Sequence, residues 1–163
     1  MAYTTANLNK DDHTQLVMSN TDLAWAAGIM DGEGTIGLKK RYRKEKNVTT
    51  YHVRTAVEVT DKQMIDKLYS IFNCGSLHIR DRVGNNKRHY SWICGSRDTE
   101  YVLKQIIRYL VTKKERAKYM LEYLGRLTTH HEHGMGSKHL PAAEIQQREF
   151  FFNLLHILNK RGV

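Results

Sequence analysis

The segment AAGIMDGEG, residues 26–34, lies where a predicted helix over residues 21–30 passes into a predicted strand. Asp31 and Glu33 fall at the C-terminal end of this helix, where the macrodipole is negative and each carboxylate costs on the order of 0.3–1 kcal/mol. An arrangement that costs stability suggests a function. A divalent cation would reverse the cost, because Mg²⁺ and Ca²⁺ prefer carboxylate and carbonyl oxygens as ligands. The alternative is a glycine-rich turn with two solvated acids, and these residues alone slightly favour it.

The same helix carries a face of small residues. Ala24, Ala27 and Gly28 are spaced by three or four positions, so they lie on one side of the helix and allow another backbone to approach closely. Gly32 and Gly34 are expected to end the helix. This face is therefore a candidate packing surface.

Beyond this segment, alternating apolar and polar side chains predict two β-hairpins. The first joins residues 35–43 to residues 50–59, and the second joins residues 77–82 to residues 89–94 through a turn at residues 84–86. Period-two alternation places one face of each hairpin in the core and leaves the other face in solvent.

Helices are predicted after each hairpin. Thr60 with Gln63, and Thr112 with Glu115, have the capping-box spacing that opens a helix. Apolar residues with helical periodicity mark a further helix between these two. Pro141 is suited to the first position of a final helix.

The predicted order is helix, hairpin, helix, hairpin, helix and further helices, which indicates an α+β fold with a four-stranded antiparallel sheet backed by helices. We expect residues 1–19 to form an N-terminal arm and residues 20–163 a single domain. Its core would span residues 20–127, and residues 140–160 would add a C-terminal helical extension.

The chain is basic: its 163 residues include 26 Lys and Arg against 17 Asp and Glu, giving a net charge of +9. This excess favours a polyanionic partner, although charge alone does not separate nucleic-acid binding from a merely basic surface. Cys74 and Cys94 lack zinc-ligand spacing and indicate buried thiols in a reducing compartment. No apolar run approaches the ~18 residues that span a bilayer, so no membrane partner is expected.

Residues 26–34 resemble the defining motif of the LAGLIDADG homing endonucleases, with Ala26 where Leu is usual. The predicted elements over residues 20–125 are similar to the αββαββα unit of that family. The resemblance implies a site-specific endonuclease that makes a metal-dependent double-strand break in a long, pseudo-palindromic DNA target. The single motif implies a homodimer, because two-motif members hold both halves in one longer chain.

The resemblance also implies a dimer interface in which two copies of the motif helix pack about a two-fold axis. Ala24, Ala27 and Gly28 would form the close-packed face. Asp31 would stabilise the turn and the interface.

Catalytic roles follow from the same resemblance. Glu33 would bind a divalent metal with the carbonyl of Gly32; Mg²⁺ is the expected cofactor, and Ca²⁺ is expected to bind without supporting cleavage. Lys113, with Lys114 as second choice, would lie near the scissile phosphate, the alternative being a solvated residue in a first helical turn. Asp61 would either orient water or contribute electrostatics at a helix N-terminus, and the sequence favours neither role over the other.

The solvated faces of the two hairpins would contact base edges in the major groove, where the four base pairs differ. Some members of this set are expected to be ordinary surface charges. The set comprises Lys39, Arg41, Arg43, His52, Arg54 and Glu58 in the first hairpin, and Arg80, Arg82, His89 and Ser91 in the second. Neighbouring cations are expected mostly on phosphates: Lys40, Lys44, Lys46, Lys87 and Arg88.

Two other functions share this charge and fold. One is an RNA maturase that binds its own intron RNA and assists splicing, and the other is a degenerate DNA-binding module without cleavage. The expected location is intracellular, in a chloroplast or mitochondrion if the source is eukaryotic and otherwise in the cytoplasm. The four histidines of residues 129–139 favour a surface loop over a transition-metal site.

Overall fold

The structure is a computed structural model that describes residues 18–81, 88–127 and 140–160. Three predicted features lie outside these ranges. They are most of the N-terminal arm, the turn of the second hairpin with Arg82 and Lys87, and the histidine-rich loop.

Within the described residues, the chain forms five α-helices, four strands and one short 3-10 helix. In order they are α1 (Asn20–Glu33), β1 (Gly34–Arg43), η1 (Lys44–Lys46), β2 (Val48–Val59), α2 (Lys62–Phe72), β3 (Ser76–Arg80), β4 (His89–Cys94), α3 (Ser96–Ile106), α4 (Lys114–Leu127) and α5 (Ala142–Leu158). The strands form one antiparallel sheet with the order β1-β2-β4-β3. The predicted α+β fold with an αββαββα core is confirmed.

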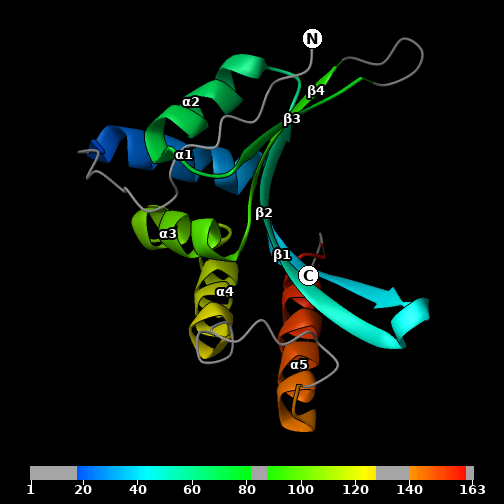
Figure 1. The fold of residues 1–163 in the computed structure, drawn as a ribbon. Coiled ribbons are helices and arrows are strands. Elements are labelled where there is room, and N and C mark those ends of the chain that lie inside the picture. The colour runs from blue at the N-terminus through cyan, green and yellow to red at the C-terminus, as the bar shows by residue number, and fades with distance from the viewer. Residues whose placement is uncertain (1–17, 82–87, 128–139, 161–163) are drawn as a thin grey trace.

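Helices α1 to α4 lie on one side of the curved sheet, and the opposite side is open (Figure 1). Strand alternation explains the arrangement, because Ile36, Val57 and Trp92 all point toward the helices and are 0% exposed. The Trp92 ring stacks on Phe72 of α2 with centroids 5.6 Å apart, and its indole N–H donates to the Cys74 carbonyl at 2.8 Å. One whole face of the sheet is thus left for a partner.

The two cysteines are buried free thiols, as the sequence predicted. Contact with Cys74, together with burial, raises the pKa of the Cys94 thiol, so it stays protonated and unreactive. None of the helices in the described ranges combines the length and apolarity needed to cross a bilayer.

Helix α1 begins and ends differently from the prediction. Ser19 is its N-cap, accepting a hydrogen bond from the Asp22 amide at 3.1 Å. The helix continues to Glu33, and Gly34 opens β1 with no intervening loop. A Cβ atom at position 34 would lie 2.2 Å from Sδ and 2.6 Å from the carbonyl oxygen of Met30, so the position requires glycine for room. The φ of Gly34, −79°, is an ordinary extended value.

Neither predicted capping box forms as expected. The N-cap of α2 is Asp61, whose carboxylate accepts from the Gln63 amide at 2.9 Å, in place of Thr60. The hydroxyl of Thr112 donates to the Asp31 carboxylate at 3.0 Å. At α2 the acid next to Thr60 accepts the capping hydrogen bond, whereas at α4 the helix begins only at Lys114, two positions after Thr112.

The Asp31 carboxylate joins the end of α1 to the connection between α3 and α4. It accepts hydrogen bonds from the amide of Val111 at 2.7 Å and the amide of Lys113 at 2.9 Å, besides the Thr112 hydroxyl. Burial alone would raise the pKa of Asp31, but these donors outweigh it and lower the pKa below its ordinary value. Asp31 is therefore ionised at neutral pH and fixes the position of the α1 C-terminus.

The Lys113 ammonium reinforces this junction. It donates to the carbonyl of Met30 at 2.9 Å and also to the carbonyl of Asp31, and the residue is only 8% exposed. A cation at a helix C-terminus is favourable because the last carbonyls carry partial negative charge. This buried cation is the physical reason that two acids are tolerated at the end of α1.

Helix α5 completes the domain by packing on α4 and on the edge strand β1. Its Phe151 ring contacts Tyr123 of α4 with centroids 5.5 Å apart. Pro141 was predicted as the first residue of this helix; it is the N-cap of α5, and the helix begins one position later at Ala142.

Replacing Asp31 tests this junction. Asp31→Asn is expected to lower the free energy of unfolding by about 1–3 kcal/mol at neutral pH, because the amide loses charge-assisted hydrogen bonds and turns an N–H toward other donors. The folded-state pKa lies below that of the unfolded chain, so the carboxylate's contribution is complete above about pH 4 and is lost as pH falls through the folded-state value. Urea unfolding of both proteins over a pH series measures the difference.

Asp66→Asn is the matched control, since Asp66 is an exposed acid paired with Lys62 within α2. Its effect should stay below about 0.5 kcal/mol. The assigned role of Asp31 would be contradicted if Asp31→Asn lost no more unfolding free energy than Asp66→Asn. It would also be contradicted if the difference between Asp31→Asn and the wild type did not become smaller at acidic pH.

Candidate active site and nucleic-acid interface

The last turn of α1 carries two groups whose oxygen atoms could bind a metal ion. Glu33 is exposed, and Gly32 is exposed with nothing within 4 Å of the position of a Cβ. Gly32 lies inside the helix, so the prediction that it stops the helix is wrong. A helical hydrogen bond to its carbonyl would need the amide of Ile36, which lies in β1. The Glu33 carboxylate and the Gly32 carbonyl therefore remain candidates for a hard cation.

One chain does not complete a metal site within the described ranges. No group of three or more His, Cys, Asp or Glu side chains lies close enough there to hold an ion. Mg²⁺ requires six oxygen ligands, usually including waters and substrate phosphate oxygens. Glu33 and Gly32 fit such an ion in chemical type, and further ligands would come from a second copy or from a nucleic acid.

Lys113 lies immediately before α4 and is buried. The alternative of a solvated first-turn lysine is therefore wrong. Its ammonium contacts the carbonyls of Met30 and Asp31, which brings it to the helix end that carries Glu33. Lys114 is exposed and is the first residue of α4. Lys113 therefore lies at the same end of α1 as Glu33, and its place near a scissile phosphate stays a prediction.

Asp61 follows the end of β2. Gly34 at the start of β1 pairs with Val57 near the end of β2, so Glu33 and Asp61 lie at the same end of the sheet. The Asp61 carboxylate accepts from the Gln63 amide at the start of α2. The helix-capping role is therefore present, and orientation of water stays a prediction.

The outer side of α1 carries a stripe of small residues. Ala24 and Gly28 are exposed, and nothing lies within 4 Å of a Cβ at Gly28 or Gly32. These three residues are spaced by four and share one face. Ala27 is 0% exposed because its methyl group packs in the chain's own core, so its prediction as an interface residue is wrong. The Asp31 carboxylate accepts hydrogen bonds within its own chain, as described above. This agrees with its predicted role in the turn, whereas its predicted role at the dimer interface stays a prediction.

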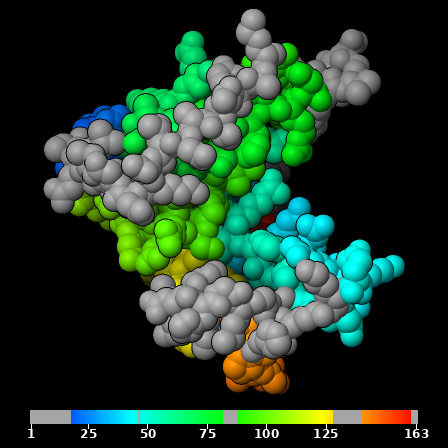
Figure 2. All heavy atoms as spheres, viewed as in Figure 1, coloured from blue at the N-terminus to red at the C-terminus, as the bar shows by residue number. Residues whose placement is uncertain are grey.

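The open face of the sheet gathers the predicted cations. Directly opposite partners share a face, so Lys39 lies beside His52 across β1 and β2, and Arg80 lies beside His89 across β3 and β4. The projecting β1–β2 hairpin and the β3–β4 end stand apart with a hollow between them (Figure 2). The predicted residues on this face are Lys39, Arg41, Arg43, His52, Arg54, Glu58, Arg80, His89 and Ser91.

Four details of this face differ from the sequence analysis. Ser91 lies on it but is only 5% exposed, which argues against a direct base contact. His78 and Thr50 belong to it and were missed, although period two counted back from Arg80 would have found His78. Lys40 points to the helix side and pairs with Glu149 of α5, so its prediction as a phosphate contact is wrong.

Glu58 is the one carboxylate on the open face among the described strand residues. Its Oε1 lies 3.5 Å from Nδ1 of His89. An acid on a surface that faces a polyanion is unfavourable unless it accepts hydrogen bonds, for example from an amino group of a base. Glu58 is therefore a candidate contact for an amino group of a base on this face.

Arg88, next to the second hairpin, is already paired. Its Nε lies 2.5 Å from the Asp81 carboxylate, and both side chains are more than half exposed. A cation held by an exposed acid can still move to a phosphate, because such a pair is weak.

Comparison with known proteins agrees with this geometry. A family model described as LAGLIDADG endonuclease matches residues 26–125, which include the end of α1 and the whole sheet. A search of curated protein sequences finds no match.

Solved structures of similar fold are homing endonucleases. I-CvuI, in complex with the I-CreI target in the presence of 2 mM Mg with the DNA not cleaved, has 18% identity and a TM-score of 0.66, over 88% of this chain and 86% of that chain. The archaeal intron-encoded I-Vdi141I complexed with DNA has 11% identity and a TM-score of 0.68, over 88% and 87%. I-LtrWI bound to target DNA has 16% identity and a TM-score of 0.64, over 85% of this chain and 45% of that longer chain.

At these identities, the structural likeness establishes the fold. The family model adds a match in sequence over more than half of the chain, including the junction that carries Glu33. The chain therefore belongs to the LAGLIDADG endonuclease family.

Proposed function

We propose that the chain is a site-specific homing endonuclease that acts as an intracellular homodimer, in an organelle or in the cytoplasm. It makes a metal-dependent double-strand break in a long, pseudo-palindromic DNA target. The observation that carries the proposal is the exposed Glu33 at the end of α1, held beside an open, basic sheet face. The solved relatives bound to DNA support the same class of substrate.

Each residue at the α1 end has a distinct proposed task. The Glu33 carboxylate and the Gly32 carbonyl would hold a divalent metal, with Mg²⁺ as the cofactor. When bound, such an ion activates water and offsets charge on the reacting phosphate. Lys113 would supply positive charge near that phosphate, and Asp61 would orient water. Ca²⁺ would bind without supporting cleavage.

The dimer is proposed because one chain carries half of a site. Ala24, Gly28 and Gly32 leave room on the outer side of α1 for a second α1 to approach. Packing about a two-fold axis would bring the two copies of Glu33 near each other, one for each DNA strand.

Base contacts would come from the open face of the sheet. Five Lys and Arg residues among the described strands lie there: Lys39, Arg41, Arg43, Arg54 and Arg80. Arg and Lys suit guanine and phosphate, whereas Glu58 suits the amino group of cytosine. The opposite face packs against the helices over the core of the sheet, where Ile36, Val57 and Trp92 are buried.

Removing the proposed metal ligand tests catalysis. Glu33→Gln is expected to slow cleavage at least about 100-fold in Mg²⁺, because several kcal/mol of metal-derived stabilisation are lost. Binding of the target in Ca²⁺ should change by less than about threefold, because the sheet face is untouched. Cleavage of DNA that spans the intron-insertion site of the host gene, measured beside filter binding, checks both.

Glu122→Gln is the control, since Glu122 is an exposed acid of α4 paired with Arg126, away from both α1 and the sheet. It should cut at the wild-type rate. Absence of a double-strand cut by the wild type in Mg²⁺, combined with binding of its own intron RNA, would replace the endonuclease with the maturase.

A second prediction concerns base recognition. Glu58→Gln is expected to weaken a preference for cytosine at one position in each half-site by about 5–150-fold, equivalent to about 1–3 kcal/mol. A carboxylate can only accept a hydrogen bond, as the cytosine amino group requires, whereas an amide can also donate one. The same change at Glu100, which is paired with Lys104 on α3, should leave the preference unchanged. Competition binding with base-substituted targets measures it. Equal weakening for every target would show a nonspecific role.

A third prediction concerns assembly. Gly28→Leu is expected to preserve the folded monomer, since nothing lies within 4 Å of its Cβ and leucine favours helix. The dimer dissociation constant should rise at least about 30-fold, because two overpacked side chains meet at the two-fold axis. Gly125→Leu, at an exposed position of α4, is the control. Sedimentation that found the variant as dimeric as the wild type would exclude this face as the interface.

A further inference from the structure

The β1–β2 hairpin is longer than the helix layer that packs against it. On the helix side, Ile36 is 0% exposed and Leu38 is partly buried, whereas Tyr42 near the tip is 56% exposed. The Tyr42 hydroxyl donates only to Asn47 of the same hairpin, at 2.7 Å. The last part of the hairpin therefore projects beyond the helix layer (Figure 1).

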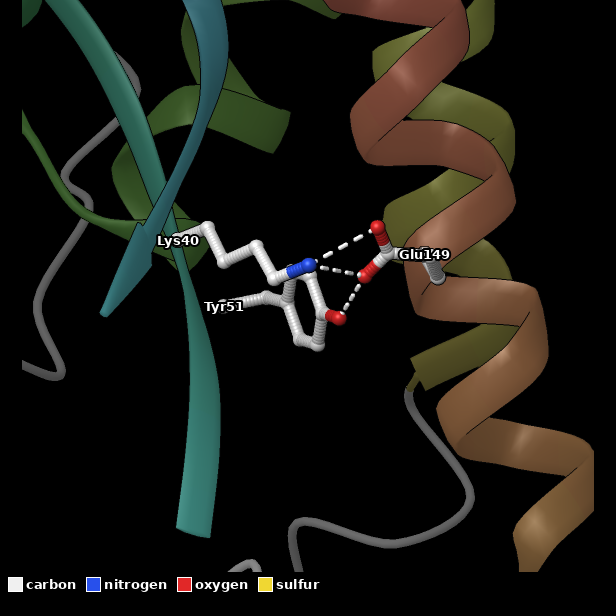
Figure 3. A network of polar contacts seen from close by, with 3 residues as sticks. All are labelled: Lys40, Tyr51 and Glu149. Carbon is white, nitrogen blue, oxygen red and sulfur yellow. Dashed lines mark hydrogen bonds and ion pairs between the residues drawn. The ribbon is translucent and has the colours of Figure 1, made fainter. Parts of the chain in front are cut away.

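A polar network lies where this projection begins. Lys40 and Tyr51 are direct cross-strand partners on the helix side, and both point to Glu149 of α5 (Figure 3). The Lys40 ammonium donates to both carboxylate oxygens, at 2.8 and 2.7 Å, and the Tyr51 hydroxyl donates to one of them. The ammonium also lies 5.7 Å from the ring centroid of Phe152, which is three positions after Glu149 on α5. One side chain of α5 thus holds both strands at once.

A second attachment lies farther along the same helix. The Asn159 side-chain amide, just after α5, donates to the Ile36 carbonyl at 3.1 Å. Ten helical residues from Glu149 to Asn159 rise about 15 Å, and four strand residues from Lys40 to Ile36 span about 13 Å. Helix α5 therefore runs along β1 and is attached to it at two matched points.

The groups of the network are in the protonation states that it needs. The hydrogen bond from Lys40 is the main reason that the pKa of Glu149 is lowered. Burial, then the hydrogen bond to Glu149, raises the pKa of Tyr51 to about 12. At neutral pH the carboxylate is charged and the phenol keeps its proton.

The network is poorly suited to global stability. Lys40 and Glu149 are 39% and 36% exposed, and ion pairs at such exposure contribute little to the stability of a whole domain. Its effect is local, because a hairpin without helix support bends at the last point where it is held.

The opposite face of this point carries proposed DNA contacts. Strand alternation places Lys39 and Arg41 on either side of Lys40, and Thr50 and His52 on either side of Tyr51, all pointing away from α5. Lys40 lies seven strand positions from Glu33, or about 23 Å. The direction of the hairpin at Lys40 therefore decides where the outer contacts meet a DNA half-site.

We propose that Glu149 is a positioning residue: with Lys40 and Tyr51 it braces the β1–β2 hairpin, and thereby sets specificity for the outer base pairs of each half-site. The inference rests on the proposed function for its DNA part. The brace itself is a property of the free chain.

The DNA part is tested by selection from a randomised duplex library in Ca²⁺. Glu149→Gln and Tyr51→Phe should each reduce discrimination at the outermost base pairs by about threefold to tenfold, with discrimination near the cut unchanged. The double variant should lose no more than either single one, because both act through one network. The rate of cleavage of bound DNA in Mg²⁺ should stay within about twofold of the wild type.

The brace is tested separately by amide hydrogen exchange of the free protein. Exchange over residues 41–50 should accelerate at least about threefold in Glu149→Gln, and exchange in β3 and β4 should not change. Glu122→Gln is the matched control, because Glu122 forms a similar half-exposed ion pair with Arg126 on α4 without touching the sheet.

The outcomes separate the two claims. Equal exchange in the variant and the wild type would overturn the brace. Faster exchange with an unchanged specificity profile, or a loss spread evenly over all positions, would overturn the positioning role. A wild type that selects no DNA would instead defeat the proposed function, and the exchange data would then decide the brace alone.

Discussion

Three hydrogen bonds to the carboxylate of Asp31 hold the end of α1 against the α3–α4 connection. Two of the donors are backbone amides, so the Asp31 side chain attaches α1 to the main chain of that connection and not merely to another side chain. Because Lys113 belongs to the same connection, its ammonium is delivered to the α1 carbonyls by the same contact. The exposed end of the helix, the start of β1 and the buried cation therefore occupy one rigid unit. Without the Asp31 carboxylate, only the Lys113 ammonium and the passage into β1 would hold the end of α1 and Glu33 in place.

The sequence predicted those parts of the molecule that depend on the local spacing of apolar and polar side chains. Alternation identified both hairpins and their open faces, because a period of two is a property of the strand alone. It could not place Ala27 in the core, since a helix with small residues all round does not reveal which stripe the core takes. It could not find the partner of Lys40, which lies 109 positions away on α5. Nor could it predict that Thr112 would donate to Asp31, because the acid comes from a distant element.

Charge is divided between two regions with different demands. The open face gathers cations along the strands, which suits a long polyanion, while the acids of the site lie at one end of it. Glu58 is the exception on that face, and its proximity to His89 reduces the cost of a lone carboxylate there. The domain thus combines attraction that is insensitive to sequence with a few groups able to discriminate. In the proposed enzyme both properties belong to one surface, and α1 adds the acid at its end.

The direct passage from α1 into β1 has a consequence for how such a protein could change over time. No loop separates Glu33 from the first strand, and Gly34 leaves no space for a side chain that would loosen the junction. In the proposed enzyme, the distance between the cut and the recognised bases is therefore set by the continuous backbone that leads from Glu33 into β1. One inserted residue would turn every contacting side chain of β1 to the opposite face. In the proposed enzyme, exchange of side chains along β1 would therefore change the contacted bases without moving the cut within the target.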